Sequence, residues 1–192
     1  MNLEDLPGAT HLNADEIIGL KPLHLTTQHQ LDEWEQLNIL EGETWAKRYH
    51  GDLLDQTFLR RLHEKMFGET WSWAGHFRLS DKNIGVPWAQ IPMKLKDLAD
   101  DVRYQIDNRT FPNDEIAARF HHRLVFIHPF PNGNGRWARF ATDLLIQRLG
   151  HCRFSWGRDS LIEDTETRSR YLAALRAADG HHLELLLEFV RS

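Results

Sequence analysis

The chemically richest stretch of the chain runs from His128 to Arg139 and reads HPFPNGNGRWAR. Its Gly-Asn-Gly core suits an anion site, because glycine tolerates the backbone angles that let successive N–H groups converge on one ligand. Arg136 and Arg139 are three residues apart. On a helix they share one face, and their guanidinium groups match phosphate oxygens. His128 stands at the other end of the stretch, where an imidazole can accept a proton. The stretch therefore predicts a polyphosphate site with a general base beside it.

The stretch resembles the signature of the Fic (Fido) family, H-x-F-x-D/E-G-N-G-R-x-x-R. The segment WAGHFRL, residues 73–79, resembles the Fic segment that leads into the flap, and the resemblance covers residues 50–190. The segment TTQHQLDEWEQLNILEGETWA, residues 26–46, is similar to the subgroup called mobile mystery protein B. The signature positions that coincide are His128, Phe130, Gly133, Asn134, Gly135, Arg136 and Arg139.

The resemblance implies protein AMPylation, the transfer of AMP from ATP to a hydroxyl of a target protein with release of pyrophosphate. His128 is then the general base that deprotonates a Ser, Thr or Tyr hydroxyl, and Phe130 anchors the loop in the core. Catalysis would rest on positioning and on stabilising charge at the attacked phosphorus. The nucleotide-binding residues that the resemblance implies are Gly133, Asn134, Gly135, Arg136 and, for the γ-phosphate, Arg139.

A flap is the second element that the resemblance implies. Residues 75–92 interrupt the helical pattern with two glycines, two prolines and scattered β-formers, which predicts a short β-hairpin. In the family such a flap aligns a target segment by strand addition. The residues expected to dock the target are Asn83, Ile84, Gly85, Val86, Pro87 and Trp88.

The acidic position of the signature, which helps to hold Mg²⁺ in the family, is Asn132 in this chain. A neutral amide oxygen can still ligate a hard cation, but without the attraction of a carboxylate. Three functions stay open. The first is an adenylyltransferase that uses ATP and Mg²⁺, with Asn132 as a metal ligand. The second is a non-catalytic nucleotide-binding module, in which the replacement of the acidic residue by Asn132 has abolished catalysis. The third is a phosphotransferase of the Doc type, which ranks last because Doc-like proteins depart from the Gly-Asn-Gly-Arg run that this chain keeps.

Many Fic proteins carry an inhibitory helix with the motif S/T-x-x-x-E-G/N, whose glutamate pairs with the second arginine of the signature. The segment Leu37–Gly42, LNILEG, matches this motif at its last two positions but not at its first. By spacing alone, Glu41 is an exposed helical carboxylate. Its place before the Fic-like core and beside the stripe of Asn38 and Trp45 favours a contact with Arg139 instead, which predicts that Glu41 is inhibitory.

The elements that must position these residues are mostly helices. Thr27 and Gln30 form a capping-box signature, and a helix over about 28–48 follows. A helix that starts at Asn113 should end before Pro129, since proline disfavours helical geometry in the residue ahead of it. We expect further helices over about 58–66, 95–106, 136–149, 167–178 and 181–191. The fold class is therefore mainly α, a single Fic-like helical domain with a small β-hairpin flap.

Three segments are expected along the chain. Residues 1–26 read as an N-terminal arm, residues 27–49 as an N-terminal helix that could inhibit, and residues 50–192 as the Fic-like core. The 192 residues suffice for one domain with a proper core. The mobile mystery resemblance implies a regulatory helix-turn-helix partner beside the hydroxyl-bearing target protein.

Composition excludes several other classes. The net charge of -5 argues against direct nucleic-acid binding. The one cysteine, Cys152, allows neither an internal disulfide nor a cysteine zinc site. There is no secretory leader and no apolar run long enough for a membrane span, so a cytoplasmic protein without membrane contact is expected. Arg168 and Arg170 lie far from the motif in sequence and are expected at the surface.

Overall fold

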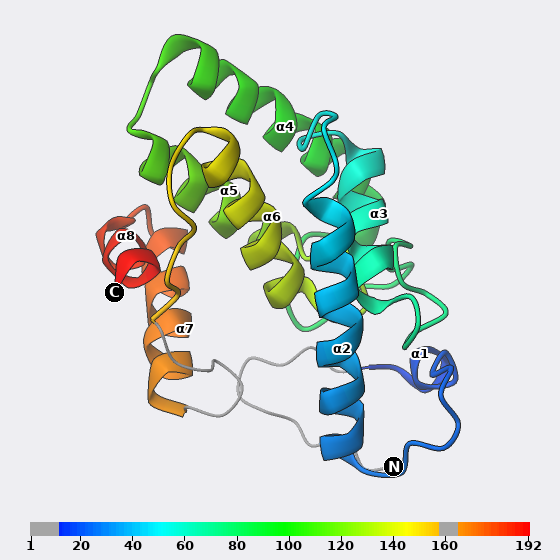
Figure 1. Cartoon of the computed structure of the whole chain (residues 1–192). Coiled ribbons are helices and arrows are strands. Elements are labelled where there is room, and N and C mark those ends of the chain that lie inside the picture. Colours follow the sequence, from blue (N-terminus) through cyan, green and yellow to red (C-terminus); the bar gives the residue numbers. More distant parts are fainter. Residues whose placement is uncertain (1–11, 158–164) are drawn as a thin grey trace.

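The computed structural model describes residues 12–157 and 165–192, and these residues form a helical domain (Figure 1). The mainly α prediction is confirmed. Residues 1–11 of the expected N-terminal arm lie outside the described part. The helices are α1 (Ala14–Ile17), α2 (Gln28–Ala46), α3 (Gln56–Phe67), the 3₁₀ turn η1 (Trp88–Gln90), α4 (Ile91–Asn108), α5 (Asn113–Ile127), α6 (Asn134–Arg148), α7 (Thr165–Asp179) and α8 (Glu184–Arg191).

Helix α2 begins with the capping box that the sequence predicts. The Gln30 amide donates to the Thr27 hydroxyl at 3.2 Å, and the Thr27 amide donates to Oε1 of Gln30 at 3.2 Å. The helix then lies along α3 (Figure 1). The close approach depends on Gly42, where an added Cβ would stand 2.8 Å from the Lys65 carbonyl oxygen. A larger residue at this position would push α2 away from the rest of the domain.

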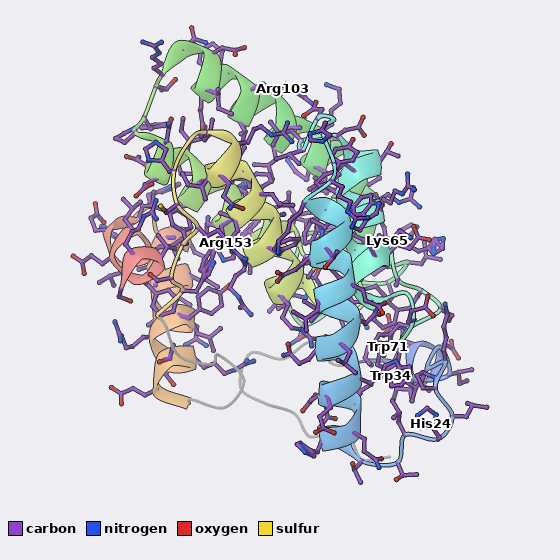
Figure 2. The ribbon with its side chains drawn as sticks, in the orientation of Figure 1. His24, Trp34, Lys65, Trp71, Arg103 and Arg153 are labelled. Atoms are coloured by element: carbon purple, nitrogen blue, oxygen red, sulfur yellow. The ribbon has the colours of Figure 1, made fainter. Side chains whose placement is uncertain are left out.

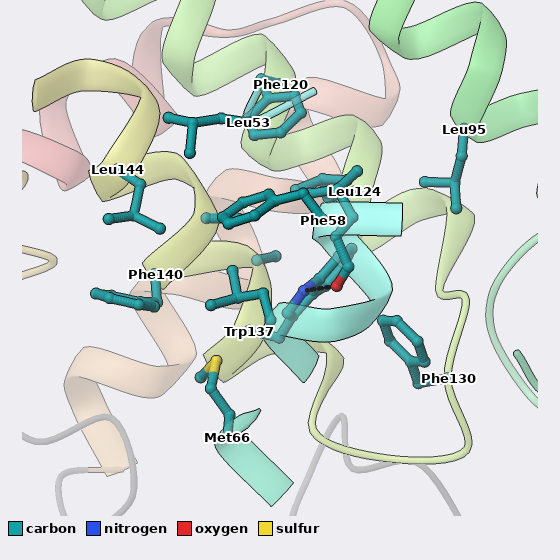
Figure 3. Close-up of a cluster of buried hydrophobic side chains, with 14 of the residues drawn as sticks. Leu53, Phe58, Met66, Leu95, Phe120, Leu124, Phe130, Trp137, Phe140 and Leu144 are labelled. Carbon is teal, nitrogen blue, oxygen red and sulfur yellow. Dashed lines mark hydrogen bonds between the residues drawn. The ribbon is translucent and has the colours of Figure 1, made fainter. Parts of the chain in front are cut away.

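The main core lies among α3, α4, α5 and α6, where apolar side chains from four helices meet (Figure 3). Trp137 of α6 is fully buried there, and its indole N–H donates to the Leu59 carbonyl at 3.0 Å. A second cluster, built by α7 and α8, covers the opposite side of α5 and α6. The helices that flank the motif are thus fixed from both sides. Among the described residues, no helix combines the length and the apolar character that crossing a bilayer requires.

The motif loop connects α5 to α6, as the sequence predicts. Helix α5 ends at Ile127, and His128 takes the left-handed conformation with φ of 53° ahead of Pro129. Gly133 is also left-handed, with φ of 76°, and α6 starts at Asn134, two residues before the expected start. The two left-handed residues turn the chain at each end of a short loop. This turn places the signature residues between two packed helices.

The predicted β-hairpin is wrong: the described backbone over residues 76–87 contains no strand, and η1 follows it. The backbone amides at positions 78 and 86 bond to the motif loop and to the end of α5 rather than to each other. The Arg78 amide donates to the Pro129 carbonyl at 2.9 Å, and the Val86 amide donates to the Ile127 carbonyl at 3.4 Å. Because residues 127–129 take up these donors, no two-stranded ladder forms. We call residues 78–88 the flap below.

The buried histidines predict acid sensitivity. Burial lowers the pKa of both His63 and His121 to about 3, and that of His128 to about 4. Below the ordinary value of 6.5, the unfolded chain binds protons that the folded chain refuses, so stability is complete above that pH and falls toward the folded pKa. As the pH falls from about 7.5 to 5.5, each histidine should lower the free energy of unfolding by about 1.4 kcal/mol, and the three together by about 4 kcal/mol.

Urea unfolding at the two pH values measures this loss. His121→Phe should remove about a third of it, whereas His29→Asn, at an exposed position, should leave it unchanged. A wild-type free energy of unfolding that stays constant over the window would contradict the assignment of neutral buried imidazoles.

Candidate functional site

The motif loop is closed by the side chain of Asn134, which is almost fully buried. The Phe130 amide donates to its Oδ1 at 2.9 Å, and its Nδ2 donates to the Phe130 carbonyl at 2.8 Å. The amide group thus satisfies a donor and an acceptor of the loop backbone at once. Its side chain is therefore engaged in the loop, and only its backbone N–H, at the start of α6, remains for a ligand.

His63 of α3 holds the loop from below, and sequence reasoning missed it. Its Nδ1 accepts from the Gly75 amide at 3.0 Å, so Nε2 carries the proton and donates to the Asn132 carbonyl at 3.0 Å. The imidazole also stacks on the Phe130 ring, with centroids 3.7 Å apart. With a pKa lowered to about 3 by burial, His63 is neutral at neutral pH. No signal in the sequence distinguishes His63 from the other residues on the core-facing side of this helix.

Asn132, the expected metal ligand, lies at the top of the same loop. Its Oδ1 accepts from the Gly133 amide at 2.6 Å, and an amide oxygen of this kind can ligate a hard cation. In the part of the chain that the structure describes, no group of three or more His, Cys, Asp or Glu side chains could hold a metal ion. The site therefore fits only a cation that the phosphate oxygens of a nucleotide largely ligate.

His128 is 4% exposed and lies at the end of α5. Its Nδ1 is 3.3 Å from the Val125 carbonyl oxygen, an arrangement in which Nδ1 carries the proton and Nε2 is the basic nitrogen. Burial is the main reason that its pKa falls to about 4, and the positive charges of Arg78 and Lys82 lower it further. The imidazole is therefore neutral at neutral pH and can accept a proton.

The first motif arginine, Arg136, is paired with a carboxylate. Its Nη1 lies 2.5 Å from Oε2 of Glu35, a buried residue in the middle of α2. The other carboxylate oxygen of Glu35 accepts from the indole N–H of Trp71 at 2.6 Å. Figure 2 shows Trp71 beside the lower half of α2. The Arg136 guanidinium also lies over the Phe67 ring, 5.0 Å from its centroid.

The predicted contact between Glu41 and Arg139 is wrong. Glu41 is exposed and lines a surface pocket together with Lys21 and Lys65. The reason is helical phase: six residues separate Glu41 from Glu35, which places the two side chains about 120° apart around the helix. The inward face of α2 contains Leu31, Glu35, Asn38, Ile39, Gly42 and Ala46. The carboxylate that reaches the motif is therefore Glu35, and it contacts the first arginine.

Arg139 lies against α7. Its Cζ is 5.7 Å from the centroid of the Tyr171 ring, and the Tyr171 hydroxyl is 2.9 Å from Nε2 of His121. Burial is the main cause that lowers the pKa of Arg139, the Tyr171 oxygen counteracts it, and Arg136 and Arg168 lower it further. The described residues offer Arg139 no carboxylate partner. Such a desolvated cation favours an anion beside it.

Arg168 belongs to this group of cations, which corrects the expectation that it serves only the surface. It is half-buried, and its charge lowers the pKa of both Arg139 and Tyr171. It precedes Tyr171 by three residues, so both project from one face of α7. Arg170 is exposed, as expected. Sequence reasoning missed Arg168 because nothing local tells which face of α7 meets α6.

The flap lies directly over His128. A Cβ added to Gly85 would stand 2.7 Å from the His128 Cβ, which places the flap backbone against the imidazole residue. Gly85 also has φ of 103°, a conformation that favours glycine. Of the expected docking residues, only Val86 is buried; Asn83, Ile84, Gly85, Pro87 and Trp88 are exposed. The structure thus brings the flap, the imidazole and the loop together.

Comparison with known proteins agrees with this geometry. The family model described as Fic/DOC family matches residues 53–146, from the segment before α3 to near the end of α6. "Protein adenylyltransferase fic-1" from Caenorhabditis elegans is 32% identical over 192 residues, which cover 96% of this chain and 33% of that protein. The chain thus spans about a third of the length of the first curated relatives that it matches.

Solved structures share the fold. The N-terminal Fic domain of a VirB-translocated Bep effector protein from Bartonella quintana aligns with a TM-score of 0.69 at 20% identity, covering 88% of this chain and 84% of that one. A structure of that domain with bound ADP aligns with a TM-score of 0.66 at 20% identity, covering 88% and 86%. At this identity the likeness shows the fold alone.

The group of Arg136, Arg139 and Arg168 predicts a binding site for polyphosphate. Arg168→Ala should weaken binding of both ATP and inorganic tripolyphosphate by about tenfold, the size expected for one charge-assisted hydrogen bond. Isothermal titration calorimetry measures both affinities. Arg170→Ala, two residues away on the same helix and exposed, is the matched control and should bind both ligands as the wild type does. Equal affinities for the two variants would remove Arg168 from the site.

Proposed function

Because residues 53–146 form a Fic/DOC-family domain, we propose that this chain is a protein adenylyltransferase that transfers AMP from ATP to a Ser, Thr or Tyr hydroxyl of a target protein. The observation that carries the proposal is a neutral, buried His128 under the flap, in one motif with Arg136 and Arg139. The relatives named protein adenylyltransferase support the same reaction.

The chemistry follows from these positions. Nε2 of His128 accepts the proton of the target hydroxyl, and the hydroxyl oxygen forms a bond to the α-phosphorus of ATP. The bond from that phosphorus to the bridging oxygen of pyrophosphate breaks, and pyrophosphate leaves with the electron pair. Arg136, Arg139 and Arg168 stabilise the charge on the phosphate oxygens. Because His128 is neutral at neutral pH, no proton has to leave it before it acts.

The nucleotide is ATP in this proposal, and a Bep Fic domain with bound ADP supports nucleotide use. Asn132 would help to hold a Mg²⁺ ion, which would neutralise part of the phosphate charge. The flap residues Asn83 to Trp88 would dock the target, and exposed Ile84 and Trp88 offer apolar contacts. A helix-turn-helix regulatory partner and a cytoplasmic location, implied by the resemblance and by the single cysteine, complete the proposal.

ATP labelled at different phosphates separates AMP transfer from the two alternatives. With ATP labelled on the α-phosphate, the protein should label a component of a cell lysate or itself, and with ATP labelled on the γ-phosphate it should not. His128→Ala should lower the transfer rate by at least about a hundredfold, because the imidazole moves the proton, while calorimetry should show nearly unchanged ATP affinity. Label from the γ-phosphate would favour the Doc-type phosphotransferase. Tight ATP binding with neither label transferred would favour the non-catalytic module.

Inhibition of nucleotide binding by α2 can be tested at Glu35. We propose that Glu35 inhibits, because its carboxylate and a phosphate compete for the Arg136 guanidinium. Glu35→Gln keeps an acceptor for the Trp71 indole and removes the charge, so ATP affinity and auto-modification should rise by about tenfold. Glu41→Gln, on the exposed face of the same helix, is the matched control and should change neither. Calorimetry with ATP and mass spectrometry of the purified variants give both quantities, and a rise in the Glu41 variant alone would reverse the assignment.

The role of Asn132 as a metal ligand can be tested by restoring the carboxylate at this position. Asn132→Asp restores a charged oxygen at the position of the Oδ1 that now accepts from Gly133, so the Mg²⁺ concentration needed for half-maximal transfer should fall by about tenfold. ATP affinity should also become more dependent on Mg²⁺, which calorimetry with and without the ion measures apart from activity. If neither quantity changes, Asn132 is not a ligand and the nucleotide holds the metal without it.

A further inference from the structure

Arg78 is a buried cation that the proposed reaction does not use. The residue is 2% exposed, yet its guanidinium donates to backbone carbonyls on three sides. Nε donates to the His128 carbonyl at 2.8 Å, Nη1 to the Ser80 carbonyl at 2.8 Å, and Nη2 to the Val86 carbonyl. The closest carboxylate is that of exposed Asp81, 3.7 Å from Nη1. Carbonyl dipoles, rather than a counter-ion, therefore hold most of this charge.

These three carbonyls belong to different parts of the site. Ser80 and Val86 lie on the two limbs of the flap, and His128 carries the proposed base. The flap has no strand pairing of its own, so the planar guanidinium replaces the ladder that a hairpin would have. Gly85 completes the arrangement: an added Cβ there would lie 2.8 Å from Nη2 of Arg78 and 2.7 Å from the His128 Cβ. The flap, Arg78 and His128 form one contact group.

The same guanidinium acts on the charge state of the imidazole. After burial, which is the main cause, the positive charges of Arg78 and Lys82 lower the pKa of His128, and the Val125 carbonyl raises it. Lys82 is paired with the Glu16 carboxylate, which reduces the net field it exerts. Arg78 thus has both a geometric and an electrostatic connection to His128, and a substitution can separate the two.

We propose that Arg78 is a positioning residue that couples the flap to His128, holding the flap over the base in the arrangement that receives a target hydroxyl. The proposal rests on the proposed function for its catalytic meaning. Three carbonyls at fixed positions match the planar fork of a guanidinium, and the compact ammonium of lysine cannot reach all of them. When the Arg78 guanidinium binds all three carbonyls, the flap is therefore ordered above a base of fixed orientation.

Two substitutions at Arg78 separate its contacts from its charge. Arg78→Lys keeps the cation and loses most of the carbonyl contacts. The backbone amide of Val86 should then exchange its hydrogen at least about tenfold faster, and the NMR titration midpoint of the His128 imidazole should rise as the loosened flap uncovers it. Arg78→Met loses contacts and charge, so the exchange should be equally fast and the titration midpoint should move further upward than in Arg78→Lys. With α-labelled ATP, auto-modification should fall at least about tenfold in both variants, while ATP affinity should stay within about twofold of the wild type.

Two further variants keep the test decisive. Arg60→Met removes an arginine that donates to the Gly75 carbonyl at 2.9 Å, at the start of the same segment, without a contact to His128. It should leave the exchange rate of Val86, the His128 titration and the transfer rate unchanged. Gly85→Ala keeps the Arg78 side chain but adds a Cβ that would lie 2.8 Å from its Nη2 and 2.7 Å from the His128 Cβ, so it perturbs the same contact group from the flap side. It should reproduce the fast exchange and the slow transfer if the Arg78 variants do not fold.

The outcomes are distinct. If Arg78→Lys leaves the Val86 amide protected, or if Arg60→Met loosens it equally, Arg78 does not couple the flap to the base. A titration midpoint in Arg78→Met no higher than in the wild type would mean that Arg78 does not hold the flap over the base, and would overturn the proposal. If the wild type transfers no label, the proposed function fails, whereas hydrogen exchange and NMR still decide whether the coupling exists.

Discussion

The site depends on a loop whose polar backbone is satisfied by neutral side chains. Asn134 binds both backbone groups of Phe130, and the neutral His63 ring donates to the Asn132 carbonyl while it stacks on Phe130. Buried polar groups that lack such partners would cost more free energy than one hydrogen bond returns. Because neither of these two side chains carries charge at neutral pH, the loop keeps its shape without placing a carboxylate between the motif arginines.

That neutrality leaves the cations around the loop with little internal compensation. Arg136 has Glu35, while Arg139 has only the oxygen and ring of Tyr171 among described groups. Removing a guanidinium from water is unfavourable unless something negative replaces the water. A polyphosphate would supply that charge and would bind only the folded chain, so it should also stabilise the fold by mass action. The desolvation of these guanidinium groups thus favours binding of an anion beside them.

Much of this could be predicted from the sequence because the signals are local. The capping box at Thr27, the helix end before Pro129 and the left-handed Gly133 follow from backbone chemistry that neighbouring residues determine. Contacts between distant elements could not be predicted. Arg168 depends on how α7 rests against α6, and the phase of α2, which selects Glu35 rather than Glu41, depends on packing against α3 through Gly42. The hairpin prediction failed for the same reason, since a distant loop takes the donors that a strand partner would have used.

Neighbouring contacts of α2 support the ion pair between Glu35 and Arg136. Trp71 binds the second carboxylate oxygen, and Asn38, one turn further along α2, accepts from the Glu69 amide at 3.1 Å. Gly42 keeps the next turn of α2 against the Lys65 backbone. A phosphate that takes Arg136 therefore leaves a buried carboxylate with a single indole donor, which is costly unless α2 shifts with it. Because the helix is fixed at successive turns along one face, such a shift involves the whole helix rather than one rotamer. The strength of the proposed restraint would thus be set by the packing of α2 on α3, remote from the phosphate itself.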